Sequence, residues 1–190
     1  MAVTPSTMLA LGTAAPGFTL PNPADGTRVT LPDFDGHPAL LVMFICNHCP
    51  FVVHVMPELR KLQDDYMHQG LALVAINANS LKTHAQDGPE NMKALVAEQG
   101  WTFPFLFDES QDVAKAYTAA CTPDFFLFDN ARRLAYRGQL DDSRPGNGKP
   151  VTGRDLRAAI ERVLEGESPS DDQRPSIGCN IKWHPGTSPA

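Results

Sequence analysis

Two cysteines, Cys46 and Cys49, stand three positions apart at the end of an apolar run, and Pro50 follows them directly. An amphipathic segment begins after Pro50. If the run is a buried strand and the segment a helix, both sulfurs lie at the helix N-terminus, where unpaired N–H groups and the helix dipole favour a thiolate. Thiolates attack disulfides and peroxides, so the spacing predicts a redox centre.

Two further cysteines lie elsewhere in the chain. Cys121 directly precedes Thr122 and Pro123, and Cys179 lies in the C-terminal segment. Each is interpreted either as a small buried hydrophobic residue or as an additional thiol of the site, and in the second case Cys179 could resolve an oxidised Cys49. Four cysteines in 190 residues are too few for a disulfide scaffold, which favours chemistry over structural cross-linking.

Metal binding or redox sensing by the same sulfurs is the non-enzymatic alternative. Ligands in addition to Cys46 and Cys49 would have to come from His48, His54, Cys121, Cys179 or His184. The sequence has no second CxxC and no HxxxH pair, which are typical of metal sites. We therefore expect neither a metal nor a cofactor.

The elements that position these residues follow from hydrophobic periodicity. Residues 14–36 predict a β-hairpin, and the apolar run over 39–45 predicts a central strand buried on both faces. Residues 50–70 have helical periodicity, and Pro57 either kinks that helix or begins a second one. A second buried strand over 71–77 then predicts a parallel βαβ unit.

The remaining chain alternates between helices and strands and ends in a polar tail. The sequence predicts a helix from Pro89 to Gly100, a strand over 103–107, a short helix over 112–117, a strand over 125–128 with a hairpin partner over 134–138, and a helix over 154–164. Apolar residues alternate at Ile177, Cys179, Ile181 and Trp183. We therefore expect one domain over 1–165 and a tail over 166–190 that docks on it through 177–183.

Composition excludes several classes of partner. The net charge is −6 and basic residues form no cluster, which argues against nucleic-acid binding. The sequence has no apolar run of membrane-spanning length and no basic region followed by an apolar core near residue 1, so we expect no membrane association and no secretory signal. With 42% hydrophobic and 20% charged residues, we expect a soluble cytoplasmic protein.

This order of elements resembles the thioredoxin superfamily, and within it the AhpC/TSA redoxin type and a peroxiredoxin-like subgroup with a CxxC motif. The resemblance covers residues 15–164 and depends on the segment 15–20, on Cys46 and Cys49, and on Thr122-Pro123-Asp124 before a strand. It implies an α/β, thioredoxin-like fold in which helices flank a central mixed β-sheet. An N-terminal β-hairpin extension and an extended C-terminal tail complete it.

The resemblance also implies roles for individual residues. Cys46 is the exposed attacking thiol, Cys49 resolves the mixed disulfide, and Pro123 is a cis proline facing both sulfurs. Thr122 and Asn47 are expected to contact the substrate. His48, directly before Cys49, is expected to favour a Cys46 thiolate and so to lower the pKa of Cys46 below that of a free cysteine.

The resulting function is a thiol-disulfide oxidoreductase that uses a Cys46–Cys49 dithiol/disulfide pair. Its substrate is a protein or small-molecule disulfide, and a dithiol is the electron donor. The alternative is a peroxiredoxin-like thiol peroxidase with Cys49 as the peroxidatic cysteine. In that comparison Cys46 occupies the threonine position of a T-x-x-C motif, and no arginine adjoins Cys121-Thr122-Pro123.

Overall fold

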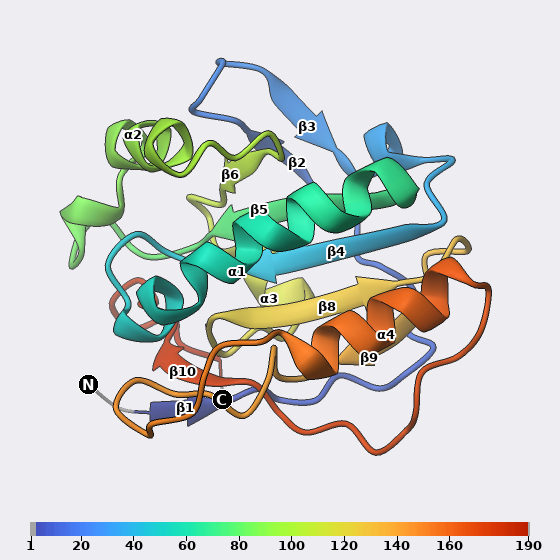
Figure 1. Ribbon diagram of the computed structural model, residues 1–190. Helices are drawn as coiled ribbons and strands as arrows, with labels where there is room; N and C mark the ends of the chain where they lie inside the picture. Colours follow the sequence, from blue (N-terminus) through green and yellow to red (C-terminus); the bar gives the residue numbers. More distant parts are fainter. Residues whose placement is uncertain (1–2, 190) are drawn as a thin grey trace.

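A mixed five-stranded sheet forms the centre of the molecule in the computed structural model, which describes residues 3–189 (Figure 1). Its strands, in the order β6-β5-β4-β8-β9, are β6 (Phe105–Phe107), β5 (Leu71–Asn77), β4 (Ala39–Phe44), β8 (Asp124–Phe128) and β9 (Leu134–Arg137). The first three are parallel, whereas β8 and β9 run antiparallel to their neighbours. The predicted mixed sheet and parallel βαβ unit are therefore confirmed.

Side chains alternate along the central strands, so each face of the sheet forms its own core. The helices are α1 (Pro50–Tyr66), α2 (Pro89–Gln99), α3 (Asp112–Ala116) and α4 (Arg154–Leu164), with short 3-10 turns η1 (Leu31–Phe34), η2 (Met67–Gln69) and η3 (Ala85–Asp87). Leu41 and Met43 of β4 pack with residues of α1, α2 and α4, whereas Leu40 and Val42 pack with residues of α3. Every residue of β4 is consequently buried, as its apolar sequence predicts.

The long segment after Cys49 forms a single helix, α1, with Pro57 inside it. Cys49 is its N-cap and Pro50 occupies the first turn, where a missing N–H costs nothing. Pro57 cannot donate a hydrogen bond to the carbonyl oxygen one turn earlier, at Val53. Val53 is 53% exposed, so the missing bond lies on the solvent-facing side of the helix. The sequence allowed either one helix kinked at Pro57 or a second helix beginning there, and the structure shows one continuous helix.

A second, three-stranded sheet joins distant parts of the chain. Its order is β1-β10-β7, with β1 (Val3–Pro5), β10 (Ile177–Asn180) and β7 (Cys121–Thr122) all antiparallel. Figure 1 shows β10 beside β1 and close to the N-terminal end of α1. The sequence analysis did not predict β1. A separate hairpin pairs β2 (Thr19–Pro21) with β3 (Arg28–Thr30), inside the predicted range 14–36.

No helix among residues 3–189 combines the length and the apolar character needed to cross a bilayer.

Candidate active site

The CxxC motif lies where β4 ends and α1 begins. Ile45 donates its N–H to the Ile76 carbonyl oxygen at 3.0 Å, which extends the pairing of β4 with β5 up to the first cysteine. The chain then turns, and the Cys49 carbonyl oxygen accepts the N–H groups of Val52 and Val53 at 2.9 Å each. The side chains of Cys46 and Cys49 are 1% and 0% exposed. The sequence predicts this strand–CxxC–helix junction correctly, but both sulfurs are buried.

The loop before β8 faces the two sulfurs. The Thr122–Pro123 peptide bond is cis, as the resemblance implied. Cys49 Sγ lies 3.3 Å from the Thr122 carbonyl oxygen, and Cys46 Sγ lies 3.6 Å from Thr122 Oγ1. Strands β7 and β8 flank the proline, and β8 pairs with β4 with Asp124 opposite Phe44. Neighbouring strands of connected sheets thus fix the distance between the CxxC motif and Pro123.

The third thiol of the cluster is Cys179, on β10. Its Sγ lies 2.7 Å from Cys49 Sγ, and its side chain is 3% exposed. Cys121 is also buried, but its Sγ contacts the Pro123 carbonyl oxygen at 3.5 Å. The structure holds all four cysteines as thiols. It therefore brings Cys46, Cys49 and Cys179 together and directs Cys121 to the backbone beside Pro123.

A hydrogen bond between Cys46 and Cys49 shifts the pKa values of the two thiols in opposite directions. Hydrogen bonds from the Cys46 and Cys179 thiols, and from Thr122 and the Val52 backbone, lower the pKa of Cys49 to about 4 despite its burial. The same bond to Cys49, together with burial and the negative charge of Asp87, raises the pKa of Cys46. The expectation that Cys46 is an exposed thiol with a lowered pKa is therefore wrong: its side chain is buried and its pKa is raised.

The pKa values of the other two thiols also rise. Burial, followed by the hydrogen bond to Cys49 and its charge, raises the pKa of Cys179 to about 12. Burial raises the pKa of Cys121, and the charge of Asp124 adds to the effect. Among the four cysteines, Cys49 is therefore the one whose pKa is lowered, a shift that favours a thiolate.

A buried carboxylate, Asp87, holds the loop between the two cysteines. Its Oδ1 accepts the Asn47 backbone N–H at 3.1 Å and a hydrogen bond from His48 Nδ1 at 2.8 Å. Its Oδ2 accepts from Asn79 Nδ2 at 2.8 Å, and its carbonyl oxygen accepts from Asn77 Nδ2 at 2.7 Å. Asp87 is fully buried, and the Asn47 and His48 geometry depends on it.

Sequence analysis missed Asp87, which lies 38 positions after Cys49 in a polar stretch with no recognisable motif. One sign was present. Asn77 ends β5, the parallel strand adjacent to β4, and Asn79 follows it. Side chains at the carboxyl ends of neighbouring parallel strands gather at one edge of the sheet. That rule places the two asparagines near the CxxC motif, and their partner in the structure is Asp87.

The side chains of His48 and Asn47 contact η3 and His84, the residue directly before it. The His48 ring stacks on His84 with 5.2 Å between centroids, and its side chain is 25% exposed. Asn47 donates from Nδ2 to the Gln86 carbonyl oxygen at 3.3 Å, while its Oδ1 is buried without a hydrogen-bond partner among the described residues. Ligand atoms of Cys46, His48 and Asp87 lie within 4.8 Å of one another and could hold a metal ion, although a tetrahedral zinc site needs a fourth ligand.

Curated relatives match two kinds of thiol protein. A Mycobacterium tuberculosis protein whose name assigns it to the peroxiredoxins is 32% identical over 117 residues, which cover 62% of this chain and 69% of that relative. Thiol-disulfide oxidoreductase ResA of Geobacillus thermodenitrificans is 29% identical over 166 residues, which cover 87% of this chain and 83% of ResA.

Solved structures are similar over nearly the whole chain. A conserved protein from Geobacillus kaustophilus, described as uncharacterized, has a TM-score of 0.96 and 53% identity over 98% of this chain and 99% of its own. A hypothetical protein from Sinorhizobium meliloti has a TM-score of 0.94 and 55% identity over 96% and 100%.

The thioredoxin-like fold and the family follow from two more matches. The thioredoxin domain of a thiol-disulfide oxidoreductase from Bacteroides vulgatus is 22% identical, with a TM-score of 0.58 over 68% of this chain and 88% of that domain. The family model described as Redoxin matches residues 10–156, which include the CxxC motif, Asp87 and Pro123. The protein is a member of the Redoxin family.

Proposed function

We propose that the protein is a thiol-disulfide oxidoreductase whose redox pair is Cys46 and Cys49. One observation carries this proposal: both sulfurs lie at the N-terminus of α1 beside the cis peptide bond of Pro123, and a hydrogen bond between them lowers the pKa of Cys49 to about 4. A thiolate with a neighbouring thiol is the arrangement that disulfide exchange requires.

The reaction has two exchange steps. The Cys49 thiolate attacks one sulfur of a substrate disulfide, forms a mixed disulfide and releases the other substrate sulfur as a thiolate. Cys46 then loses its proton, attacks Cys49 Sγ and releases the second substrate thiol. The substrate gains two electrons and ends as a dithiol, while Cys46 and Cys49 end as a disulfide. A dithiol donor restores the reduced pair by the reverse exchange.

Insulin reduction in the presence of dithiothreitol tests the activity. We expect Cys46→Ser and Cys49→Ser each to abolish the reduction that the wild type adds to dithiothreitol alone. Cys121→Ser is the matched control, because Cys121 is equally buried and directly precedes Thr122, but its Sγ is directed to the backbone oxygen of Pro123. The proposal is overturned if the wild type adds nothing to the rate of dithiothreitol alone. It is also overturned if Cys121→Ser loses as much activity as Cys46→Ser and Cys49→Ser.

The attacking sulfur is identified by trapping. In a Cys179→Ser background, Cys46→Ser removes the resolving thiol and should accumulate a mixed disulfide between Cys49 and a thionitrobenzoate-labelled peptide. Cys49→Ser in the same background should accumulate much less, because burial and the negative charge of Asp87 still raise the pKa of Cys46 when its hydrogen bond to Cys49 is lost. The reverse outcome would assign the attack to Cys46 and keep the dithiol function.

A thiol peroxidase is the second candidate, and the lowered pKa of Cys49 favours it. In this reaction Cys49 takes the oxygen of a hydroperoxide as a sulfenic acid, and a neighbouring thiol then forms a disulfide and releases water. The nearby Arg144 donates from Nη1 to the Asp141 and Ser143 carbonyl oxygens and from Nη2 to Gln139 Oε1, so its guanidinium is engaged away from Cys49. We therefore rank this activity below disulfide exchange.

Rapid mixing with hydrogen peroxide separates the two candidates. A sulfenic-acid probe should label little Cys49 in the wild type after brief exposure if disulfide exchange is the main activity. Strong labelling of Cys49, together with peroxide consumption that disappears in Cys49→Ser, would instead establish the peroxidase.

A further inference from the structure

Strand β10 occupies the backbone edge next to Pro123. Cys179 pairs with Thr122 and Asn180 with Cys121, so this segment of the chain's own tail lies antiparallel to the residues directly before the cis proline. Ser176 donates from Oγ to the Pro123 carbonyl oxygen at 2.6 Å. Any disulfide substrate that enters as an extended chain on this edge must compete with β10.

Gly178 makes this close approach sterically feasible. A Cβ atom built on Gly178 would lie 2.0 Å from the Thr122 carbonyl oxygen and 3.1 Å from the Pro123 nitrogen. Both are backbone atoms, so they cannot move aside as the end of a flexible side chain can. Only glycine therefore allows β10 to lie against the Thr122–Pro123 peptide bond and brings the next residue, Cys179, to Cys49.

Anchors on the far side of Cys179 hold the tail in this position. Ile181 donates its N–H to the Ala120 carbonyl oxygen at 3.0 Å and is buried. Lys182 donates its N–H to Asn79 Oδ1 at 2.9 Å, and its carbonyl oxygen accepts the Ser80 N–H at 2.7 Å. Since Asn79 also binds Asp87, the tail and the CxxC loop share one polar support.

We propose that β10 is an intrachain disulfide partner of the redox pair: Cys179 exchanges with the Cys46–Cys49 disulfide to form a Cys49–Cys179 disulfide. The 2.7 Å contact between Cys49 Sγ and Cys179 Sγ and the fixed register on Thr122 carry the proposal. It rests on the proposed function only in that the Cys46–Cys49 disulfide is the starting state.

The exchange is balanced without an added oxidant. Cys179 sulfur attacks Cys49 sulfur, the Cys46–Cys49 bond breaks, and Cys46 leaves with the electron pair of that bond and takes up the proton that Cys179 gives up. The number of disulfides is unchanged. The product fastens the tail over Cys49 and releases Cys46 as a thiol.

Disulfide mapping tests this exchange. Reduced protein is treated with one equivalent of oxidised glutathione, quenched with acid, alkylated and mapped by mass spectrometry without reduction. We expect the wild type and Cys121→Ser to contain both Cys46–Cys49 and Cys49–Cys179 disulfides. In Cys46→Ser, Cys49 attacks glutathione disulfide and Cys179 then displaces glutathione, so Cys49–Cys179 should be the main product. A Cys46→Ser protein that retains glutathione on Cys49 with Cys179 fully alkylated overturns the inference.

Gly178→Ala tests the role of the strand with all thiols present. The added methyl group should displace β10, lower the yield of the Cys49–Cys179 disulfide and accelerate maleimide labelling of Cys49 by about tenfold or more, the factor produced by a change of roughly 1.4 kcal/mol in local opening. Gly17→Ala is the matched control, because a Cβ at Gly17 meets nothing within 4 Å. Equal labelling rates in both variants would show that β10 does not cover Cys49.

The two proposals fail in different ways. Insulin reduction without a Cys49–Cys179 disulfide leaves the oxidoreductase and removes the intrachain partner. A Cys49–Cys179 disulfide without insulin reduction leaves a redox-active tail and removes the proposed activity on external disulfides.

Discussion

The proton between Cys46 and Cys49 determines which sulfur is nucleophilic. The pKa of Cys49 is lowered to about 4 by hydrogen bonds, chiefly from Cys46, and that of Cys46 is raised. The resemblance implied the opposite, with Cys46 as the exposed attacking thiol and His48 favouring its thiolate. Two groups that are distant in sequence add to this difference: Asp87 raises the pKa of Cys46, and Cys179 lowers that of Cys49.

A titration of the reduced protein tests this difference between the pKa values of Cys46 and Cys49. We expect the ultraviolet absorbance of a thiolate to rise with a midpoint near pH 4, the pKa of Cys49. Cys49→Ser should abolish the step. Cys46→Ala should move it upward by roughly 1–3 pH units, because the first of the donors to the thiolate is lost. A step that persists in Cys49→Ser would refute the assignment of charge.

A second prediction concerns Asp87, whose negative charge raises the pKa of Cys46. In a Cys49→Ser background, which removes the coupling between the two thiols, Asp87→Asn should lower the pKa of Cys46. The measurement is the pH dependence of iodoacetamide alkylation. Glu90→Gln is the control, since Glu90 is an exposed acid close in sequence. Equal shifts in both variants would mean that general electrostatics, not the contact with Asp87, is responsible.

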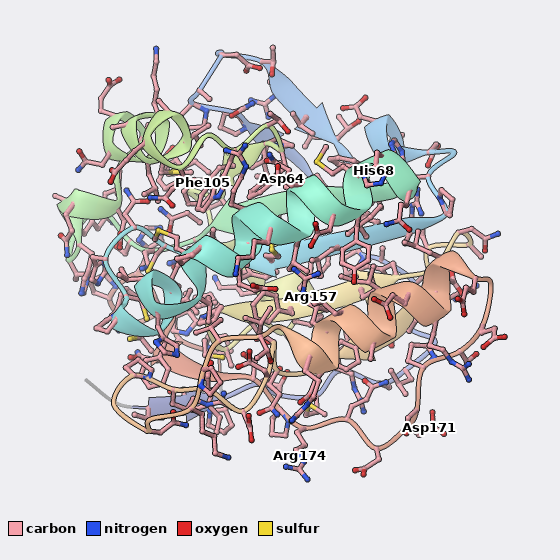
Figure 2. The ribbon with its side chains drawn as sticks, in the orientation of Figure 1. Asp64, His68, Phe105, Arg157, Asp171 and Arg174 are labelled. Carbon is pink, nitrogen blue, oxygen red and sulfur yellow. The ribbon has the colours of Figure 1, made fainter. Side chains whose placement is uncertain are left out.

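At the scale of elements, α1 and α4 are joined by a buried ion pair. Arg157 of α4 donates from Nε to Glu58 Oε1 at 2.6 Å and from Nη1 to Asp65 Oδ2 at 2.8 Å. Figure 2 shows Arg157 between the two helices. The Glu58 side chain is only 3% exposed, so its charge depends on its basic partners. The pair fixes the orientation of α1, whose N-cap is Cys49.

Arg157→Leu should therefore destabilise the protein by about 2–4 kcal/mol, because it leaves the buried Glu58 carboxylate with only the more distant Lys61. Arg154→Leu on the same helix is the control. The Arg154 side chain is 65% exposed, so its effect should stay within about 0.5 kcal/mol. Urea unfolding measures both, and similar losses would contradict the importance of the buried pair.

The first residue of β8 gives the fold a pH dependence. Asp124 is fully buried, and burial raises its pKa from 3.8 to about 7. A group whose pKa is higher in the folded state stabilises that state below the unfolded pKa, and this contribution is lost as pH rises through the folded pKa.

Relative to Asp124→Asn, the wild type should therefore lose stability between about pH 4 and pH 7, by a total of about 4 kcal/mol. Chemical unfolding at several pH values measures the difference. A difference that stays constant or grows with pH would contradict the assigned shift.

At the scale of the whole molecule, β10 lies between β1 and β7 and so connects the two ends of the described chain. Deletion of residues 177–190 would leave both neighbours unpaired and expose the core contacts of Ile181 and Trp183. We expect a loss on the order of 5 kcal/mol from the apolar surface returned to water. Circular dichroism in urea provides the measurement, and deletion of residues 186–190 is the control. Equal stability of the two truncated chains would show that the tail only rests on the surface.

The sequence predicts most of the central sheet because its strands are uniformly apolar and its helices have clear ends. The run over 39–45, Gly100 and residues 154–164 all lie where periodicity and capping place them. The strand β1 escaped prediction because it is short and has no apolar alternation of its own; it exists only through β10.

The position of the site could be predicted from the sequence, but the pKa values of its cysteines could not. Local sequence shows that Cys46 and Cys49 lie at a helix N-terminus, whereas their pKa values depend on groups contributed by other strands and turns. Asp87 and Cys179 reach the sulfurs through tertiary contacts that no spacing rule describes. Charge distribution in a buried cluster is a property of the folded chain.

The position of β10 also sets a biosynthetic order. Every other helix and strand of the described chain precedes it, so the ribosome makes the covering strand after all of them. Domains fold as they emerge, at about 5–20 residues per second. The sheet with Cys46 and Cys49 can therefore form while Gly178 and Cys179 are still untranslated. During that interval the nascent protein presents the sulfurs of Cys46 and Cys49 to the surrounding thiol pool, and translation of β10 ends that exposure.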